Sequence, residues 1–413
     1  MQRCATLSRH SATSSIISKA HPANLMPQHP ASPSLLMVVN HDWFFLSHRL
    51  PIARAAKSLG LNVSVATIDT GCADKIRHEG LDFIPLPMKV KGQNPLKELR
   101  VIAALVKMYR ERQPDLVHHV TVKPVLYGSL AARMVGGMGV VNAVSGLGYL
   151  FLGSKHARLL QPVVKRLYRL ALRHPGSRTI FQNPDDRDLF VATGLLRAEQ
   201  AVLIRGSGVD CATFVPQAEP AGIPVVMLPA RILWDKGVGE FVNAARLIKQ
   251  SDTPARFVLV GDPDPENPAA VPTTMLETWV QEGVIESWGH RRDMPKVLSN
   301  ATVVVLPSYR EGLPKALLEA AACGKAVVTT DVPGCREIVR HNVNGLLVPV
   351  RNAPALADAI QLLLQSPTLR QRFGQTGRLI AEREFADHLV VEQTMDVYRG
   401  LLGSKWPQSH PHH

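Results

Sequence analysis

The chain has 413 residues, more than one ordinary hydrophobic core holds, and its 46% hydrophobic content supports compact packing, so two α/β domains are the natural division. The formal net charge of +13 indicates an anionic partner such as a nucleic acid, a phosphorylated substrate or an acidic membrane surface. No segment reaches the roughly 18 uninterrupted apolar residues of a membrane-spanning helix, so we expect a protein that is soluble or peripheral to a membrane.

The five cysteines lie far apart and lack the spacing of metal ligands. They are Cys4, Cys72, Cys211, Cys323 and Cys335. This pattern argues against a disulfide framework and against a zinc site, and it fits a reducing cytoplasm.

Residues 1–33 contain basic residues and many serines but no acidic residue. Such a composition is typical of an organellar transit peptide. The interpretation that we favour is an unstructured leader, or an upstream start codon with Met26 as the true first residue. We predict a disordered leader over residues 1–33 and a disordered tail over residues 406–413.

Short apolar runs alternate with helical segments in the first half of the chain. The run 35–40 predicts a first strand, followed by a loop over residues 41–49 and a helix over residues 50–59. Further strands are predicted at 63–67, 83–86, 116–120, 140–144, 179–182 and 202–204. The pattern predicts a doubly wound βαβ domain over residues 34–215. No Gly-x-Gly-x-x-Gly follows the first strand, so a dinucleotide-binding role lacks its fingerprint.

A second alternation follows residues 216–224, where three prolines and a glycine predict a linker. Strands are predicted at 225–228, 257–260, 303–306, 326–330 and 345–350, with helices between them. The second domain is accordingly expected over residues 216–388.

The stretch 302–324 predicts a buried strand, a turn and a helix, with Pro314 near the first helical turn and Gly324 placed to end the helix. Glu311 then lies at the carboxyl end of the strand, beside a helix N-terminus, where open α/β sheets bind phosphorylated ligands. Glu319 projects from the helix about two turns further on. Two glutamates at this spacing are common by chance, and the alternative for Glu319 is an exposed helix charge.

Glu311 and Glu319 resemble the Glu-x7-Glu element of the large retaining glycosyltransferase family, family 4 in type, that includes sucrose and glycogen synthases. The resemblance implies the α/β fold called GT-B, in which two Rossmann-like doubly wound domains face each other across a crevice. It implies that the last helices, about residues 389–405, cross back and complete the first domain. It also implies that Glu311, with the amides of Gly312 and Leu313, binds the donor sugar and that Glu319 binds the nucleotide ribose.

Arg231 and Lys236 follow the first strand of the second domain. They resemble the family's Gly-Arg-x4-Lys-Gly, with Ala230 in place of the usual glycine. Glycosyl transfer breaks the bond to a diphosphate, and the developing negative charge needs fixed cations or a metal. The resemblance assigns this role to Arg231 and Lys236; alternatively, both are surface cations after a strand.

Asp262-Pro-Asp264 is similar to the Asp-x-Asp that binds manganese in other transferases, but its prolines and its place in a loop favour a turn. The resembled family generally works without metal, so we expect no metal and no cofactor other than the nucleotide-sugar donor. The segment 289–293 resembles the family segment that faces the nucleobase. This makes Arg291 a candidate contact for uridine.

His118 and His119 end a strand of the first domain, where many relatives have His-x-His-x-x-x-Pro and use the second histidine near the reacting centre. Val120 occupies that place here. His119 is the candidate catalytic substitute; the alternative for one of the pair is a neutral core histidine. Four residues of this domain are candidate contacts for the acceptor: His48, Arg49, Thr121 and Lys123.

Residues 153–173 combine leucines and valines on one helical face with flanking lysines and arginines, and contain no acidic residue. A basic amphipathic helix is typical of a membrane-surface contact or of a packed helix with a solvated basic rim. We favour attachment of about residues 153–173 to an anionic membrane surface. No nucleic-acid-reading motif is present, and no nucleic-acid partner is expected.

Three segments, 45–52, 118–128 and 142–148, resemble bacterial enzymes that add an N-acetylhexosamine, often N-acetylgalactosamine, to a polyprenyl-diphosphate-linked sugar. The resemblance implies a UDP-sugar donor, a role in polysaccharide or O-antigen assembly, and a peripheral cytoplasmic place on the inner face of the cell membrane. Two alternatives stay open. They are a UDP-N-acetylhexosamine 2-epimerase of the same fold and a non-catalytic polyanion-binding protein.

Overall fold

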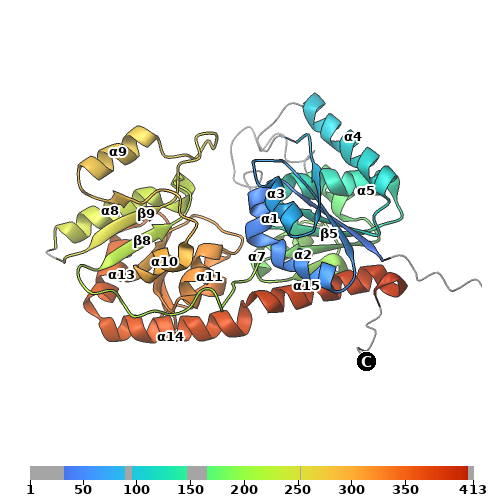
Figure 1. The fold of residues 1–413 in the computed structure, drawn as a ribbon. Coiled ribbons are helices and arrows are strands. Elements are labelled where there is room, and N and C mark those ends of the chain that lie inside the picture. The colour runs from blue at the N-terminus through green and yellow to red at the C-terminus, as the bar shows by residue number, and fades with distance from the viewer. Residues whose placement is uncertain (1–31, 89–94, 147–164, 252, 408–413) are drawn as a thin grey trace, which may run out of the picture. The chain divides into compact units, whose positions relative to one another are not determined.

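The computed structural model describes residues 32–88, 95–146, 165–251 and 253–407 (Figure 1). Residues 1–31 of the predicted leader, residues 408–413 of the predicted tail and residues 153–164 of the predicted amphipathic helix lie outside these ranges. The two sheets described below belong to one compact unit that begins at Pro33.

The first sheet has seven parallel strands in the order β3-β2-β1-β4-β5-β6-β7. Along β1, Leu35, Met37 and Val39 pack into the core on one face of the sheet, whereas Leu36 and Val38 pack on the other. A strand with both faces covered must be apolar throughout, which is why its sequence is a continuous apolar run. The strands are β1 Ser34–Val39, β2 Asn62–Thr67, β3 Asp82–Pro85, β4 Leu116–Val120, β5 Gly139–Val144, β6 Ser177–Phe181 and β7 Ala201–Leu203.

Helices cover both faces of this sheet. They are α1 Asp42–His48, α2 Leu50–Ser58, α3 Ala73–His78, α4 Pro95–Arg112, α5 Ser129–Val135, residues 165–172, and α7 Pro184–Ala192. The predicted loop over residues 41–49 is wrong, because most of it forms α1. The Asp42 carboxylate stabilises the start of that helix by accepting the N–H groups of Trp43, Thr70 and Cys72.

The second sheet has six parallel strands in the order β10-β9-β8-β11-β12-β13. They are β8 Val225–Pro229, β9 Arg256–Val260, β10 Glu286–Ser287, β11 Val303–Leu306, β12 Ala326–Thr330 and β13 Gly345–Val348. The helices around it are α8 Val238–Lys249, α9 Thr273–Gln281, α10 Met294–Ser299, α11 Lys315–Ala322, α12 Cys335–Ile338, α13 Ala353–Gln365 and α14 Pro367–Glu384.

The last helix, α15 Asp387–Leu402, returns to the first sheet. Val390, Met395, Tyr398 and Leu402 are buried in the same core cluster as Leu35 of β1, next to α2 (Figure 1). None of the helices in the described ranges is long and apolar enough to span a bilayer. Two parallel sheets with helices on both faces confirm the predicted α/β class with two Rossmann-like domains.

Candidate active site

In both sheets the chain reverses its direction of winding at one pair of neighbouring strands, and ligands bind beside the carboxyl ends of such a pair. In the second sheet this pair is β8 and β11. The loops that follow them are residues 230–237 and 307–314. These loops carry Arg231, Lys236 and Glu311, three of the predicted site residues.

Lys236 and Glu311 form an ion pair between the two loops. Lys236 Nζ lies 2.5 Å from Glu311 Oε1, which also accepts a hydrogen bond of 2.7 Å from Ser308 Oγ. The side chains are only 19% and 11% exposed, so their charges are less screened than those of a surface pair. Gly237 allows the two loops to lie close together, because a Cβ at its φ of +73° would lie 2.2 Å from the Pro307 carbonyl oxygen of the other loop.

Glu319 is largely buried on α11, where Lys315 approaches it one turn earlier with an N–O distance of 3.7 Å. Burial raises the pKa of Glu319, and the Lys315 charge opposes this rise. Lys315 Nζ also donates a 2.6 Å hydrogen bond to the Ser47 carbonyl oxygen at the end of α1. Lys315 was not among the residues predicted from the sequence. Its i,i+4 spacing to Glu319 on a helix is the pattern that would have indicated this contact.

Arg231 lies on the loop after β8 with its side chain 55% exposed, 3.4 Å from the carboxylate of Asp264. Asp262 Oδ1 accepts the backbone N–H of His290. The two carboxylates of the Asp-Pro-Asp segment therefore have different partners in the protein.

Arg291 donates two hydrogen bonds to the Asp293 carboxylate, from Nε at 2.9 Å and from Nη2 at 2.8 Å. This contact lowers the pKa of Asp293 to about 2. Arg291 lines a pocket of about 400 Å³ with Trp288 and Lys296. The lining of this pocket includes neither Lys236 nor Glu311. In the described ranges the Arg291 side chain makes its ion pair with Asp293 and none with Glu311.

His119 is fully buried, with both ring nitrogens engaged inside the core. Nδ1 lies 2.9 Å from Asn142 Oδ1 and Nε2 lies 2.8 Å from the Tyr109 hydroxyl. Burial lowers the pKa of His119 to about 4, so the ring is neutral at pH 7. His118 contacts the Tyr398 hydroxyl, and burial lowers its pKa as well. These contacts are those expected for a core histidine, the alternative that the sequence left open, and a catalytic His119 stays a prediction.

Two of the candidate acceptor residues, Thr121 and Lys123, follow β4 at the carboxyl edge of the first sheet. Thr121, after β4, has a φ of +76°, a strained conformation for a β-branched residue, and strain of this kind is concentrated at functional sites. Its buried hydroxyl has no hydrogen-bond partner among the described residues. The Lys123 charge, by contrast, is compensated by Glu98 at 2.8 Å.

His48 and Arg49 lie at the junction of α1 and α2. The His48 ring stacks on Phe44 with ring centroids 4.1 Å apart. Burial and then the Lys315 charge lower the pKa of His48 to about 3, so this ring is also neutral at pH 7. The Arg49 guanidinium is buried, which lowers its pKa to about 10, and no carboxylate in the described ranges pairs with it.

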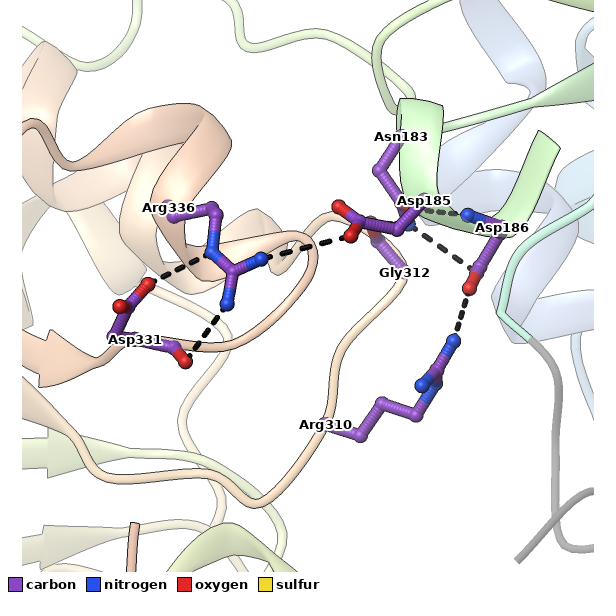
Figure 2. Close-up of polar contacts among 7 residues, drawn as sticks. All are labelled: Asn183, Asp185, Asp186, Arg310, Gly312, Asp331 and Arg336. Atoms are coloured by element: carbon purple, nitrogen blue, oxygen red, sulfur yellow. Dashed lines mark hydrogen bonds and ion pairs between the residues drawn. The ribbon is translucent and has the colours of Figure 1, made fainter. Parts of the chain in front are cut away.

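The start of α7 contacts the loop that carries Glu311 (Figure 2). Asn183 Nδ2 donates a 2.7 Å hydrogen bond to the Gly312 carbonyl oxygen, and Arg310 donates to the Asp186 carboxylate. Arg336 lies 3.5 Å from Asp185. Sequence analysis missed these contacts, because Asn-Pro-Asp-Asp after a strand predicts only a helix cap.

Comparison with known proteins assigns the chain to a class. Residues 213–380 match the family described as "Glycosyl transferases group 1", and residues 34–183 match "Glycosyl transferase 4-like".

One relative is the N,N'-diacetylbacillosaminyl-diphospho-undecaprenol alpha-1,3-N-acetylgalactosaminyltransferase of Campylobacter jejuni, 30% identical over 87% of this chain and 98% of the relative. Another is the UDP-Gal:alpha-D-GlcNAc-diphosphoundecaprenol alpha-1,3-galactosyltransferase of Escherichia coli, 24% identical over 67% of this chain and 73% of the relative. The structure of Anabaena Alr3699/HepE in complex with UDP and glucose has a TM-score of 0.71, 20% identity, and covers 88% of this chain and 98% of its own.

The fold and these matches define a GT-B glycosyltransferase. The chain belongs to the group 1 glycosyltransferases with a glycosyltransferase 4-like N-terminal domain. The comparisons do not favour the epimerase or the polyanion-binding alternative.

Proposed function

We propose that the protein transfers an N-acetylhexosamine, with retention of configuration, from a UDP-sugar to a polyprenyl-diphosphate-linked saccharide. The observation that carries this proposal is the Lys236–Glu311 pair, an oppositely charged couple at the carboxyl edge of β8 and β11. A nucleotide sugar presents hydroxyls and a diphosphate side by side. A carboxylate and an ammonium 2.5 Å apart match those two groups.

In this proposal Glu311 accepts hydrogen bonds from hydroxyls of the donor sugar, and the amides of Gly312 and Leu313 support the same ring. Lys236 and Arg231 neutralise the negative charge that develops on the diphosphate as its bond to the sugar breaks. Glu319 binds the ribose. Arg291 would reach the uracil only by leaving Asp293, so we expect the backbone of this segment to face the base.

The proposed acceptor is supported by two relatives whose names specify undecaprenol-diphosphate-linked substrates. The acceptor diphosphate needs cations and hydroxyl donors. Arg49, buried without a carboxylate partner in the described ranges, and the unpartnered hydroxyl of Thr121 meet this need better than Lys123, which Glu98 already binds. We also propose that the two domains span residues 34–215 and residues 216–388.

The test is release of UDP from a panel of UDP-N-acetylhexosamines, measured with and without a lipid-diphosphate-linked saccharide from a membrane extract. We expect UDP release that depends on the acceptor and a product one sugar longer. An epimerase would instead interconvert the UDP-sugar without any acceptor. Release that is independent of acceptor, or the absence of UDP-sugar binding by calorimetry, would contradict the proposal.

We also propose that the protein attaches to the cytoplasmic leaflet through a surface wider than the predicted helix. A groove of about 770 Å³ is lined by apolar side chains of α4 and α5, by Leu170, by Arg110 and Arg133, and by Lys107 and Glu111, which pair with each other at 3.8 Å. Leu99, Met134 and Leu170 are 60%, 63% and 46% exposed. Exposed apolar side chains among cations suit the interface of an anionic bilayer, where each cation contributes about 1 kcal/mol.

Two of the cations predicted for this surface form hydrogen bonds within the protein. Arg169 and Arg173 both donate hydrogen bonds to the Gly194 carbonyl oxygen, just beyond the carboxyl end of α7. They thereby satisfy a carbonyl near the end of a helix. The apolar side chains are therefore a sharper test of attachment than a reversal of these arginines.

The variant Leu99→Gln/Met134→Gln/Leu170→Gln is expected to lower binding to phosphatidylglycerol vesicles by at least roughly tenfold, because burial of each apolar side chain stabilises the bound state by about 1 kcal/mol or more. Vesicle sedimentation measures the effect. A matched control replaces exposed leucines around the second sheet: Leu247→Gln, Leu362→Gln and Leu379→Gln. Equal binding by both variants, or wild-type binding indifferent to anionic lipid and to salt, would contradict membrane attachment through this surface.

A further inference from the structure

Asn183 performs two separate tasks at the start of α7. As the helix N-cap, its Oδ1 accepts the backbone N–H of Asp186 at 2.8 Å. Capping requires only this oxygen. The amide nitrogen is free for a second purpose, and it donates to the Gly312 carbonyl oxygen of the second sheet's loop, in a fully buried position.

Asp186 adds a second connection to the same loop. Its carboxylate, only 2% exposed, accepts hydrogen bonds from Arg310 and from Asn183 Nδ2. Burial raises the pKa of Asp186, and the Arg310 charge opposes the rise. Two side chains of α7's first turn therefore hold the backbone segment immediately around Glu311 (Figure 2).

The space around Gly312 confines this segment further. A Cβ on Gly312 would lie 2.4 Å from the Ser145 carbonyl oxygen and 2.8 Å from Gln182 Oε1. On the other side, a Cβ on Gly334 would lie 2.6 Å from the Gly312 carbonyl oxygen. The Gly312 backbone thus has little room to rotate between the ends of β5 and β6 and the start of α12.

Peptide units are planar and almost always trans, so the N–H of Leu313 points away from the carbonyl of Gly312. A bond from Asn183 to that carbonyl therefore fixes the direction of the Leu313 N–H. We propose that Asn183 and Asp186 are positioning residues of the transferase: they orient the Gly312–Leu313 peptide and Glu311 toward the donor sugar. The inference rests on the proposed function, in which the sugar contacts these groups.

Asn183→Ser tests the first contact. Serine caps helices as well as asparagine does, so α7 should persist, but its side chain is too short to reach Gly312. We expect kcat for sugar transfer to fall by roughly ten- to a hundredfold, the scale of a misplaced catalytic group. The dissociation constant of UDP, measured by calorimetry, should stay unchanged, because UDP lacks the sugar. Arg310→Gln tests the second contact without altering α7, with the same expected split.

Asp185→Asn is the matched control. It lies on the same helical turn and loses only the Arg336 contact of 3.5 Å, so wild-type kcat is expected. Wild-type kcat in both test variants, or a parallel loss of UDP affinity and kcat, would overturn the inference; if Asn183→Ser does not fold, Arg310→Gln alone decides. Glu311→Gln is assayed alongside. If it is inactive while the test variants are active, only this inference fails, whereas an active Glu311→Gln rejects the proposed function itself.

Discussion

Replacing Lys236 with alanine is expected to lower kcat for sugar transfer by roughly 100- to 1,000-fold, the effect of removing one preorganised group that stabilises developing charge. Lys236 is the better buried of the two cations after β8, with its side chain 19% exposed against 55% for Arg231. A less exposed charge is less screened by water, so kcat should fall more when Lys236 is replaced than when Arg231 is replaced. Steady-state UDP release with saturating acceptor measures it.

The control for this variant is Lys249→Ala. Lys249 ends α8, the helix that follows Lys236, and donates a hydrogen bond to the Gly283 carbonyl oxygen, just beyond the end of α9, and not to Glu311. Wild-type turnover is expected for it. Comparable thermal unfolding of both variants would show that the loss in Lys236→Ala is chemical. Near-wild-type turnover of a well-folded Lys236→Ala would remove Lys236 from the site.

The strands were predictable because a buried parallel strand is an unbroken apolar run. Runs at 116–120, 303–306 and 326–330 coincide with β4, β11 and β12. β10 escaped detection because two residues, Glu286 and Ser287, show no periodicity. The helix α1 was missed for a different reason. Its start depends on Asp42 accepting N–H groups of Thr70 and Cys72, which lie far ahead in the sequence.

The same limit applies to the candidate site. The strand–loop–helix pattern was sufficient to predict that Glu311 lies at a strand end and that Lys236 follows a neighbouring strand. The contact between Lys236 and Glu311 joins residues 75 positions apart, and the hydrogen bond from Asn183 to Gly312 joins residues 129 positions apart. No local pattern encodes either contact. His119 illustrates the converse. Its motif predicts catalysis, whereas the structure buries its ring between Tyr109 and Asn142, each from another element, and the motif does not encode these contacts.

Glu311→Gln is expected to reduce kcat by roughly 100-fold or more while leaving UDP affinity nearly intact. Glutamine keeps the size of the side chain but removes the charge, and hydrogen bonds to an ionised acceptor are roughly twice as strong as neutral ones. The change also frees Lys236 from its carboxylate partner, so attraction for the UDP phosphates should not fall.

Glu319→Gln provides the opposite pattern. Glu319 is proposed to hold the ribose, so its variant should weaken UDP binding together with turnover. Calorimetry with UDP and kinetics with the UDP-sugar separate the two cases, since loss of an interaction made only by the reacting sugar appears in kcat and not in nucleotide affinity. If Glu311→Gln loses UDP affinity as much as Glu319→Gln does, Glu311 contacts the nucleotide, and the sugar must be bound by other groups of the loop.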